Sequence, residues 1–409
     1  MTKGRGIELT RGARVATIDG LRGLAVIGVV WYHIWQISWQ SAVVPFVDVS
    51  LQPIAETGFL GVDLFFFISG FVLMLPYAHA HLTGAPRPSL RHFVGRRFLK
   101  IVPSYLFAIA ALIAIGYQTY PSLRDAVRDV GFHLLFIHDW FALTNGSIDG
   151  VMWSLGVEIQ FYLLFPLLVL AFVRWPLRTA FALFAVANGW RLWCMYSDHY
   201  FYAQRLEQLP AYVDFFAAGM LGAFAYVAIA TLRPRLAERR WAFTALSIAG
   251  FVAVGLLIVN CYSHVGDHPW PETWKVQWRS ALAIAFLATA LGSLFAVRAY
   301  QLVLGNRLLL FLAAISYNLY LWHQPIGRLL VKLHVPPYAT LDPHEDVSWR
   351  LAVVFVALAL SITVAAVLTY AFEQPIMRLA GRRRRPVAFL VAAAEERIPV
   401  PDAPHAEQA

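Results

Sequence analysis

The chain has 409 residues, of which 59% are hydrophobic and 14% are charged, and its formal net charge is +9. Soluble domains usually carry about 25% charged residues. The composition therefore excludes the two or three soluble domains that the length alone would suggest, and it favours one polytopic membrane domain. The two cysteines, Cys194 and Cys261, are too few for a disulfide framework or a cysteine-rich metal site.

Apolar segments long enough to cross a bilayer as helices, which takes about 20 residues each, recur along the whole chain. They are residues 18–40, 58–77, 101–118, 151–173, 177–195, 209–230, 241–262, 279–297, 308–332 and 350–372. The shorter apolar segment at 130–143 is predicted to be re-entrant or interfacial. The sequence thus predicts an all-α, polytopic membrane protein with about ten transmembrane helices.

The positive charges predict how these helices are oriented. Lysines and arginines concentrate in the segments that are cytoplasmic when both termini are cytoplasmic, and this bias sets orientation in membranes. The basic clusters are therefore interpreted mainly as topological anchors, and nucleic-acid binding is not predicted. Residues 1–17 are expected to form a basic cytoplasmic N-terminus without a cleaved signal peptide, residues 18–378 the transmembrane domain, and residues 379–409 a basic and then disordered cytoplasmic tail.

The first span contains two ionisable residues, Arg22 and His33, which are eleven residues apart. At 3.6 residues per turn this spacing makes about three turns, so both side chains share one helix face. Ionisable groups within a bilayer are costly and often mark function, and histidine exchanges protons near neutral pH. A base or proton relay inside the membrane is the first hypothesis.

Polar residues on three other spans are predicted to lie at a similar depth. Asp63 is on the second span, Glu158 on the fourth and His323 on the ninth. One shared polar cavity would be cheaper than four isolated buried groups, so these three residues and His33 are expected to gather. The small residues around Asp63 are predicted to allow close helix packing; they are Gly58, Gly61, Ser69 and Gly70.

A basic cluster precedes the third span and lies at the membrane level of Arg22. Arg96, Arg97 and Lys100 form it, and Arg96 and Lys100 are predicted to share a helix face. Such a cluster binds phosphates, or it only anchors the span, and the spacing leaves both readings open. Three loop residues, His133, His138 and Asp139, line an outer loop or are simply solvated. No metal-binding spacing is present, so no metal is expected.

Six motifs in a fixed order now indicate a family. They are Asp19-Gly-Leu-Arg22-Gly-Leu-Ala with His33, Gly58-Phe-Leu-Gly-Val-Asp63-Leu-Phe-Phe-Phe-Ile-Ser69-Gly70-Phe71, Arg96-Arg97-Phe-Leu-Lys100-Ile-Val-Pro103, Trp153-Ser154-Leu-Gly-Val-Glu158 with Phe161-Tyr162, Ser316-Tyr317-Asn318-Leu-Tyr320-Leu-Trp322-His323, and Phe372-Glu373-Gln374-Pro375 with Arg378. Over residues 18 to about 378 the chain resembles the acyltransferase family 3 membrane proteins, which include bacterial O-acetyltransferases of surface polysaccharides. Lys100 departs mildly from the family pattern, which often has arginine there.

This resemblance implies a multi-pass protein of the bacterial inner membrane, surrounded by membrane lipids. Its expected activity is transfer of an acyl group, with acetyl the leading case, from cytoplasmic acyl-CoA to a hydroxyl of a cell-surface glycan. The acceptor would be a carbohydrate or a glycolipid, and acyl-CoA would be the donor substrate, with no metal ion.

The resemblance also implies roles for individual residues. The phosphates of acyl-CoA are expected near Arg22, Arg96, Arg97 and Lys100. His33 is expected to act as general base or to accept the acyl group transiently, with either Asp63 or Glu158 orienting its imidazole. The residues expected to contact substrate are Trp153, Ser154, Tyr317 and His323, and His323 is also a candidate for assisting proton movement.

Three rival functions remain open from the sequence. Buried ionisable residues also form proton relays in transporters, so a proton-coupled transporter or flippase of a glycan or lipid intermediate is the main alternative. Transporters often contain inverted repeats, and none is evident in this sequence. A hydrolase that passes the acyl group to water is a close neighbour of the transferase, and a membrane scaffold is the remaining class.

Overall fold

A computed structural model gives the fold and describes residues 15–40, 43–44, 49–197, 202–264, 272–338 and 342–382. The expected basic N-terminus and disordered tail lie almost entirely outside these described residues.

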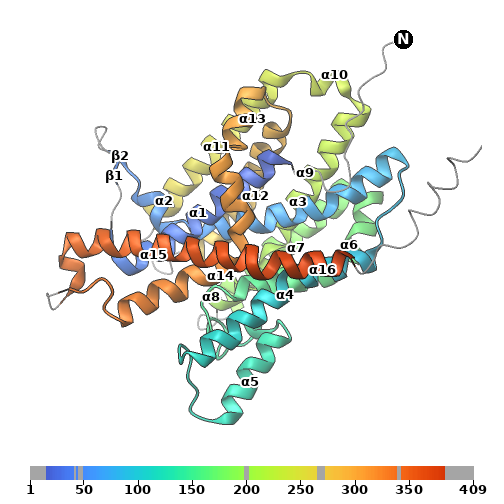
Figure 1. The fold of residues 1–409 in the computed structure, drawn as a ribbon. Coiled ribbons are helices and arrows are strands. Elements are labelled where there is room, and N and C mark those ends of the chain that lie inside the picture. The colour runs from blue at the N-terminus through green and yellow to red at the C-terminus, as the bar shows by residue number, and fades with distance from the viewer. Residues whose placement is uncertain are drawn as a thin grey trace, which may run out of the picture.

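The described residues form a helical bundle, which confirms the predicted all-α class (Figure 1). The helices are α1 (Ala16–Ser38), α2 (Gln52–Glu56), α3 (Leu60–Thr83), α4 (Leu90–Ala114), α5 (Leu123–Leu134), η1 (His138–Trp140), α6 (Trp153–Arg174), α7 (Pro176–Ser197), α8 (Tyr202–Arg205), η2 (Leu209–Tyr212), α9 (Val213–Leu232), α10 (Pro234–Ala237), α11 (Arg240–Ser263), α12 (Glu272–Phe295), α13 (Arg298–Leu304), α14 (Arg307–Lys332), η3 (Pro343–Glu345), α15 (Val347–Val367), η4 (Leu368–Glu373) and α16 (Gln374–Arg382). The strands β1 (Val43–Val44) and β2 (Val49–Ser50) form a two-residue antiparallel ladder.

Each of the ten apolar segments predicted as a span is helical in the structure. Among the described residues, seven helices are long and apolar enough to cross a membrane, and an eighth candidate is the pair α13 and α14, which is bent by 42°. The helices α1 and α7 fall short on hydropathy because polar residues, such as Arg22 in α1 and Arg191 in α7, interrupt them. The structure therefore shows a multi-pass membrane protein, while the count of ten spans and the orientation of the termini stay predictions.

Local sequence signals explain where several helices begin. The side chain of Asn306 accepts a hydrogen bond from the Leu309 backbone amide at the start of α14, and Asp346 accepts from the Ser348 and Trp349 amides at the start of α15. Such caps satisfy backbone donors that have no partner within the helix. Further along, α15 continues through the π-helical η4 into α16, and this long run crosses the front of the bundle beside α4 (Figure 1).

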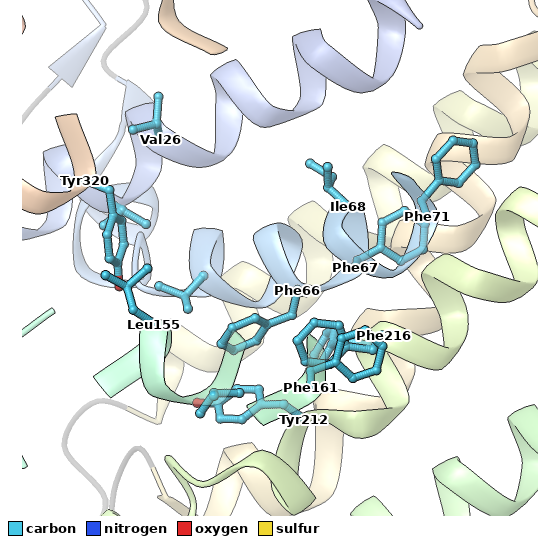
Figure 2. Packing of buried hydrophobic residues seen from close by; sticks show 14 of the residues in the cluster. Val26, Phe66, Phe67, Ile68, Phe71, Leu155, Phe161, Tyr212, Phe216 and Tyr320 are labelled. Atoms are coloured by element: carbon cyan, nitrogen blue, oxygen red, sulfur yellow. The ribbon is translucent and has the colours of Figure 1, made fainter. Parts of the chain in front are cut away.

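Close packing of α3 against α9 forms the centre of the bundle. A Cβ atom on Gly70 would collide with the Phe216 carbonyl oxygen, and one on Gly219 would collide with the Phe67 carbonyl oxygen. Glycine at both positions therefore lets the two backbones touch, as predicted for Gly70. Aromatic rings fill the space beside this contact, and the rings of Phe161 and Phe216 stack at 3.7 Å between centroids (Figure 2).

Candidate active site

A half-open cavity lies among α1, α3, α4, α6 and α14, and its empty space, with the solvent at its mouth included, is about 630 Å³. Its walls combine aromatic rings with a few charged and hydroxyl groups, which is the composition expected of a ligand site. The lining residues are Arg22, Val62, Phe65, Phe66, Ser69, Arg97, Lys100, Ile101, Ser154, Leu155, Glu158, Tyr162, Ser316, Tyr317 and Tyr320. Six residues that the sequence predicted for the site lie here, and they are Arg22, Arg97, Lys100, Ser154, Glu158 and Tyr317.

Three cations face this cavity: Arg22 from α1, and Arg97 and Lys100 from α4. Within the described ranges, no ion pair of 4.0 Å or less joins any of the three to a carboxylate. The guanidinium of Arg97 lies 5.6 Å from the centre of the Tyr162 ring, which holds it without neutralising its charge. Glu158 in the same cavity and Glu373 act on Lys100 only at longer range, so these three positive charges without a close ion pair make this part of the cavity suited to an anionic ligand.

The face of α4 that lines the cavity differs from the one predicted from the sequence. Arg97 and Lys100 face the cavity together, whereas the side chain of Arg96 is exposed and lies outside it. Residues three apart on a helix are neighbours in the same way as residues four apart. By spacing alone, Lys100 could share a cavity-facing side of α4 with Arg96 or with Arg97. In the structure it shares that side with Arg97.

Glu158 of α6 lines the cavity and accepts hydrogen bonds from two hydroxyl groups. The Ser69 hydroxyl donates to its Oε1 atom at 2.6 Å, and the Tyr162 hydroxyl donates to the same oxygen. Ser69 was predicted to be a packing residue, and its side chain also bonds to Glu158, a role that the sequence reasoning missed. A signal for Tyr162 was present in the sequence, since it lies four residues after Glu158 on the same helix face.

Hydroxyl groups of α6 and α14 close another part of the cavity wall. The Ser154 and Tyr320 hydroxyls lie 2.6 Å apart, and both also lie within hydrogen-bond distance of the Val151 carbonyl oxygen. Tyr317 lines the cavity as well and donates to the Ile101 carbonyl oxygen at 2.7 Å, which ties α14 to α4. The predicted substrate contact Trp153 lies elsewhere, with its ring stacked on Tyr212 at 5.6 Å.

The two histidines predicted on α1 and α14 do meet. His323 Nε2 lies 2.9 Å from His33 Nδ1, and the two rings are 4.8 Å apart between centroids. The His323 side chain is fully buried, whereas His33 is partly exposed. Neither imidazole lines the cavity, but the Tyr320 ring, which does, lies 5.9 Å from the His323 ring. The histidine pair therefore stands directly behind one wall of the cavity.

The two carboxylates predicted to orient His33 lie apart from its imidazole. Within the described residues no hydrogen bond joins His33 to Asp63 or Glu158. Asp63 points instead towards α12, where the Nε atom of Arg279 lies 3.6 Å from its Oδ1 atom. Asp63 and Arg279 are both buried, with exposed fractions of 1% and 2%. The expected single polar cavity is thus divided into three places: the cavity with Glu158, the histidine pair and a buried ion pair.

Asp63 belongs to a network of buried charges that joins four helices. Arg279 donates to the Tyr212 hydroxyl at 2.7 Å, and Arg191 of α7 lies 2.7 Å from Asp214 of α9. Arg191 and Asp214 are both 0% exposed. Because each charge has a partner in a low-dielectric interior, removing one partner leaves the other buried and uncompensated.

Replacing Asp214 with asparagine should lower the free energy of unfolding by about 3–5 kcal/mol, because Arg191 would then lack its counter-charge. Thermal unfolding of the detergent-solubilised protein measures the change. The matched control is Asp125→Asn, which breaks the exposed 2.9 Å pair with Arg128 and should change the stability by less than about 1 kcal/mol. Equal stability losses in the two variants would contradict a structural role for the buried pair.

Three polar side chains between the candidate spans, His133 at the end of α5 and His138 and Asp139 in the connection to α6, are buried rather than solvated. His133, His138 and Asp139 are each 0% exposed, and the two imidazoles stack at 4.0 Å between centroids. Gln160 of α6 donates to Asp139 at 2.9 Å. Burial raises the pKa of the Asp139 carboxyl to about 7. Across the part of the chain that the structure describes, no three histidine, cysteine or acidic side chains are grouped to hold a metal ion.

Comparison with known proteins gives a consistent result. A sequence model of the acyltransferase 3 family, described as an acyltransferase domain, matches residues 15–371. The O-acetyltransferase OatA of Staphylococcus aureus (strain NCTC 8325 / PS 47) is 27% identical over 337 residues, which are 76% of this chain and 50% of that protein. The peptidoglycan O-acetyltransferase OatA of Listeria monocytogenes is 27% identical over 344 residues, covering 77% of this chain and 50% of that protein.

The chain thus spans about half the length of these curated relatives. No solved structure matches it significantly. The family model covers the cavity, the histidine pair and the buried charge network, because all of their residues fall within its limits. On the strength of that match over nearly the whole helical bundle, the chain belongs to the acyltransferase 3 family.

Proposed function

We propose that this chain is an integral membrane O-acyltransferase. It moves an acyl group, acetyl in the leading case, from cytoplasmic acyl-CoA to a hydroxyl of a cell-surface glycan. The observation that carries the proposal is the cavity, where Arg22, Arg97 and Lys100 gather without a close ion pair to a carboxylate in the described residues and where Tyr320 adjoins the His33–His323 pair.

The donor would bind in the cavity. The phosphates of acyl-CoA would lie against the three cations, because charge-assisted hydrogen bonds to phosphate are the strongest contacts that these side chains make. The acyl-pantetheine arm is largely apolar, and it would extend past the aromatic wall towards Ser154 and Tyr320. This path leads from the charged part of the cavity to the histidine pair.

The acceptor would approach His33 on its exposed side. The acceptor hydroxyl oxygen attacks the thioester carbon, the carbon–oxygen bond forms and the carbon–sulfur bond breaks. His33 takes the hydroxyl proton as general base and returns it to the sulfur of the leaving CoA. Tyr320 lines the cavity and its ring lies 5.9 Å from the His323 ring, so the thioester would pass beside Tyr320 to reach the acceptor hydroxyl at His33.

Glu158 and Asp63 take different parts in this proposal from those expected of them. Glu158 would organise the cavity wall through its hydrogen bonds from Ser69 and Tyr162. Asp63 would hold α3 against α12 through Arg279. The acceptor class follows from the names of the OatA relatives, one of which is a peptidoglycan O-acetyltransferase.

The test has two arms. Mass spectrometry of envelope glycans from wild-type and deletion cells should show an acyl group that is lost in the mutant. Purified protein in liposomes should transfer labelled acetyl from acetyl-CoA to that glycan. Proton-driven glycan flux without acetyl-CoA, together with unchanged glycan masses, would instead identify a transporter or flippase. Release of free acetate without glycan labelling would identify a hydrolase.

A further inference from the structure

The His33–His323 contact determines where the protons of both imidazoles lie. His323 Nδ1 is 3.0 Å from the Leu319 carbonyl oxygen, one turn earlier on α14. A carbonyl oxygen only accepts hydrogen bonds, so the neutral His323 ring carries its proton on Nδ1. Its Nε2 atom is then a lone-pair acceptor, and this atom points at His33.

The same reasoning applies to His33. Its Nδ1 atom lies 3.0 Å from the Val29 carbonyl oxygen and 2.9 Å from His323 Nε2. Both neighbours are acceptors, so an unprotonated Nδ1 would face two lone pairs. A proton on Nδ1 satisfies both contacts as a shared hydrogen bond. The remaining nitrogen of His33, Nε2, is then unprotonated and basic.

We infer that His323 is a positioning residue that fixes His33 in the tautomer with its proton on Nδ1, which leaves Nε2 as the base. This inference rests on the proposed acyl transfer and adds the atom that takes the proton. His323 acts through His33 and does not contact substrate. The role differs from the substrate contact that the sequence predicted for His323.

Helix packing holds the pair in register. A Cβ atom on Gly20 would collide with the Leu304 carbonyl oxygen, and one on Gly23 would lie 2.5 Å from the Leu309 carbonyl oxygen. Near the other end of α1, a Cβ atom on Gly327 would lie 2.5 Å from Ile37. Because the backbone of α1 packs this closely on α13 at Gly20 and on the start of α14 at Gly23, the rings of His33 and His323 have little freedom to separate.

A neutral partner suits a base inside a membrane. A carboxylate beside His33 would bring a permanent charge into the low-dielectric interior, and that charge would need further partners. The pair of neutral imidazoles carries no charge at rest. When Nε2 takes the acceptor's proton, the bond from Nδ1 to His323 becomes charge-assisted and strengthens. The hydrogen bond from His33 to His323 therefore stabilises His33 mainly while the proton is being transferred.

Nitrogen-15 NMR of histidine-labelled protein in detergent tests the tautomer directly and without any assay of activity. The His33 signals, assigned by their loss in His33→Asn, should show a protonated Nδ1 and an unprotonated Nε2. In His323→Leu the two tautomers should mix, while His323→Gln, whose amide oxygen reaches the position of Nε2, should restore the wild-type pattern. A wild-type His33 with its proton on Nε2 would overturn the inference.

Kinetics give the second readout. His323→Leu should lower kcat about 10²-fold, with unchanged KM for acetyl-CoA and a shifted pH profile, and His323→Gln should recover much of the rate. His264→Leu, which changes an exposed loop histidine, is the matched control. A raised KM for the glycan at unchanged kcat would overturn the inference in favour of acceptor binding. If the wild-type protein showed the expected NMR pattern but no acyl transfer, the proposed function would be rejected and the tautomer assignment would stand.

Discussion

Replacing His33 with alanine is expected to lower the rate of acyl transfer by about 10²- to 10⁴-fold, the contribution typical of a general base. The His323 imidazole lies one ring further away, 4.8 Å between centroids, and Glu158 already accepts from two hydroxyl groups, so neither is placed to take the proton at the His33 position. The loss should appear in kcat. Transfer of labelled acetyl from acetyl-CoA to the glycan measures it at saturating donor.

Two controls separate this loss from damage to the fold. The variant should insert, purify and melt like the wild type, because His33 is partly exposed and belongs to no buried ion pair. Its affinity for acetyl-CoA should also be unchanged, since His33 does not line the cavity. Full transfer activity in His33→Ala would end the assignment of His33 as the base.

The helices were predictable because the bilayer imposes a simple rule. About 20 apolar residues are needed to cross the hydrocarbon, and a helix is the way to satisfy the backbone there. Every predicted segment is helical in the structure, although α1 and α7 are less apolar than the others. The same polar residues that lower the hydropathy of these two helices, Arg22 and Arg191, belong to the cavity and to the charge network.

Residues that line the cavity could be predicted together only when they lie on the same helix. Ser154 and Glu158 are one turn apart on α6, so they share one helix face, and both line the cavity. The sequence does not determine how a helix is rotated about its axis relative to its neighbours. Each residue step turns the helix by about 100°, and the sequence paired Arg96 with Lys100, whereas Arg97 is the arginine that faces inward beside Lys100.

Equal depth in the membrane proved a weak guide to contact. His33 and His323 were placed at one level and do meet, whereas Asp63 was placed there too and faces Arg279. Depth follows from counting residues along a span, but contact depends on which helices are neighbours. The packing of α1 on α14 and of α3 on α9 decides this, and it results from glycine contacts distributed over several helices.

Removing single positive charges from the cavity is expected to weaken donor binding strongly. Arg97→Gln and Lys100→Gln should each raise the Kd for acetyl-CoA, because each removes a charge-assisted hydrogen bond of about 1.5–3 kcal/mol to phosphate. At about 1.4 kcal/mol per factor of ten, this is roughly a 10- to 100-fold change. Titration calorimetry with acetyl-CoA measures it. Lys100→Arg keeps the charge and should retain most of the affinity.

Arg96 provides the matched control, since it adjoins Arg97 in sequence but its side chain is exposed outside the cavity. Arg96→Gln removes the same charge from the same helix and should change the Kd by less than about threefold, because a long-range surface charge is screened by salt. If Arg96→Gln weakened binding as much as Arg97→Gln, the effect would come from the general positive field. The cavity would then not be the donor site.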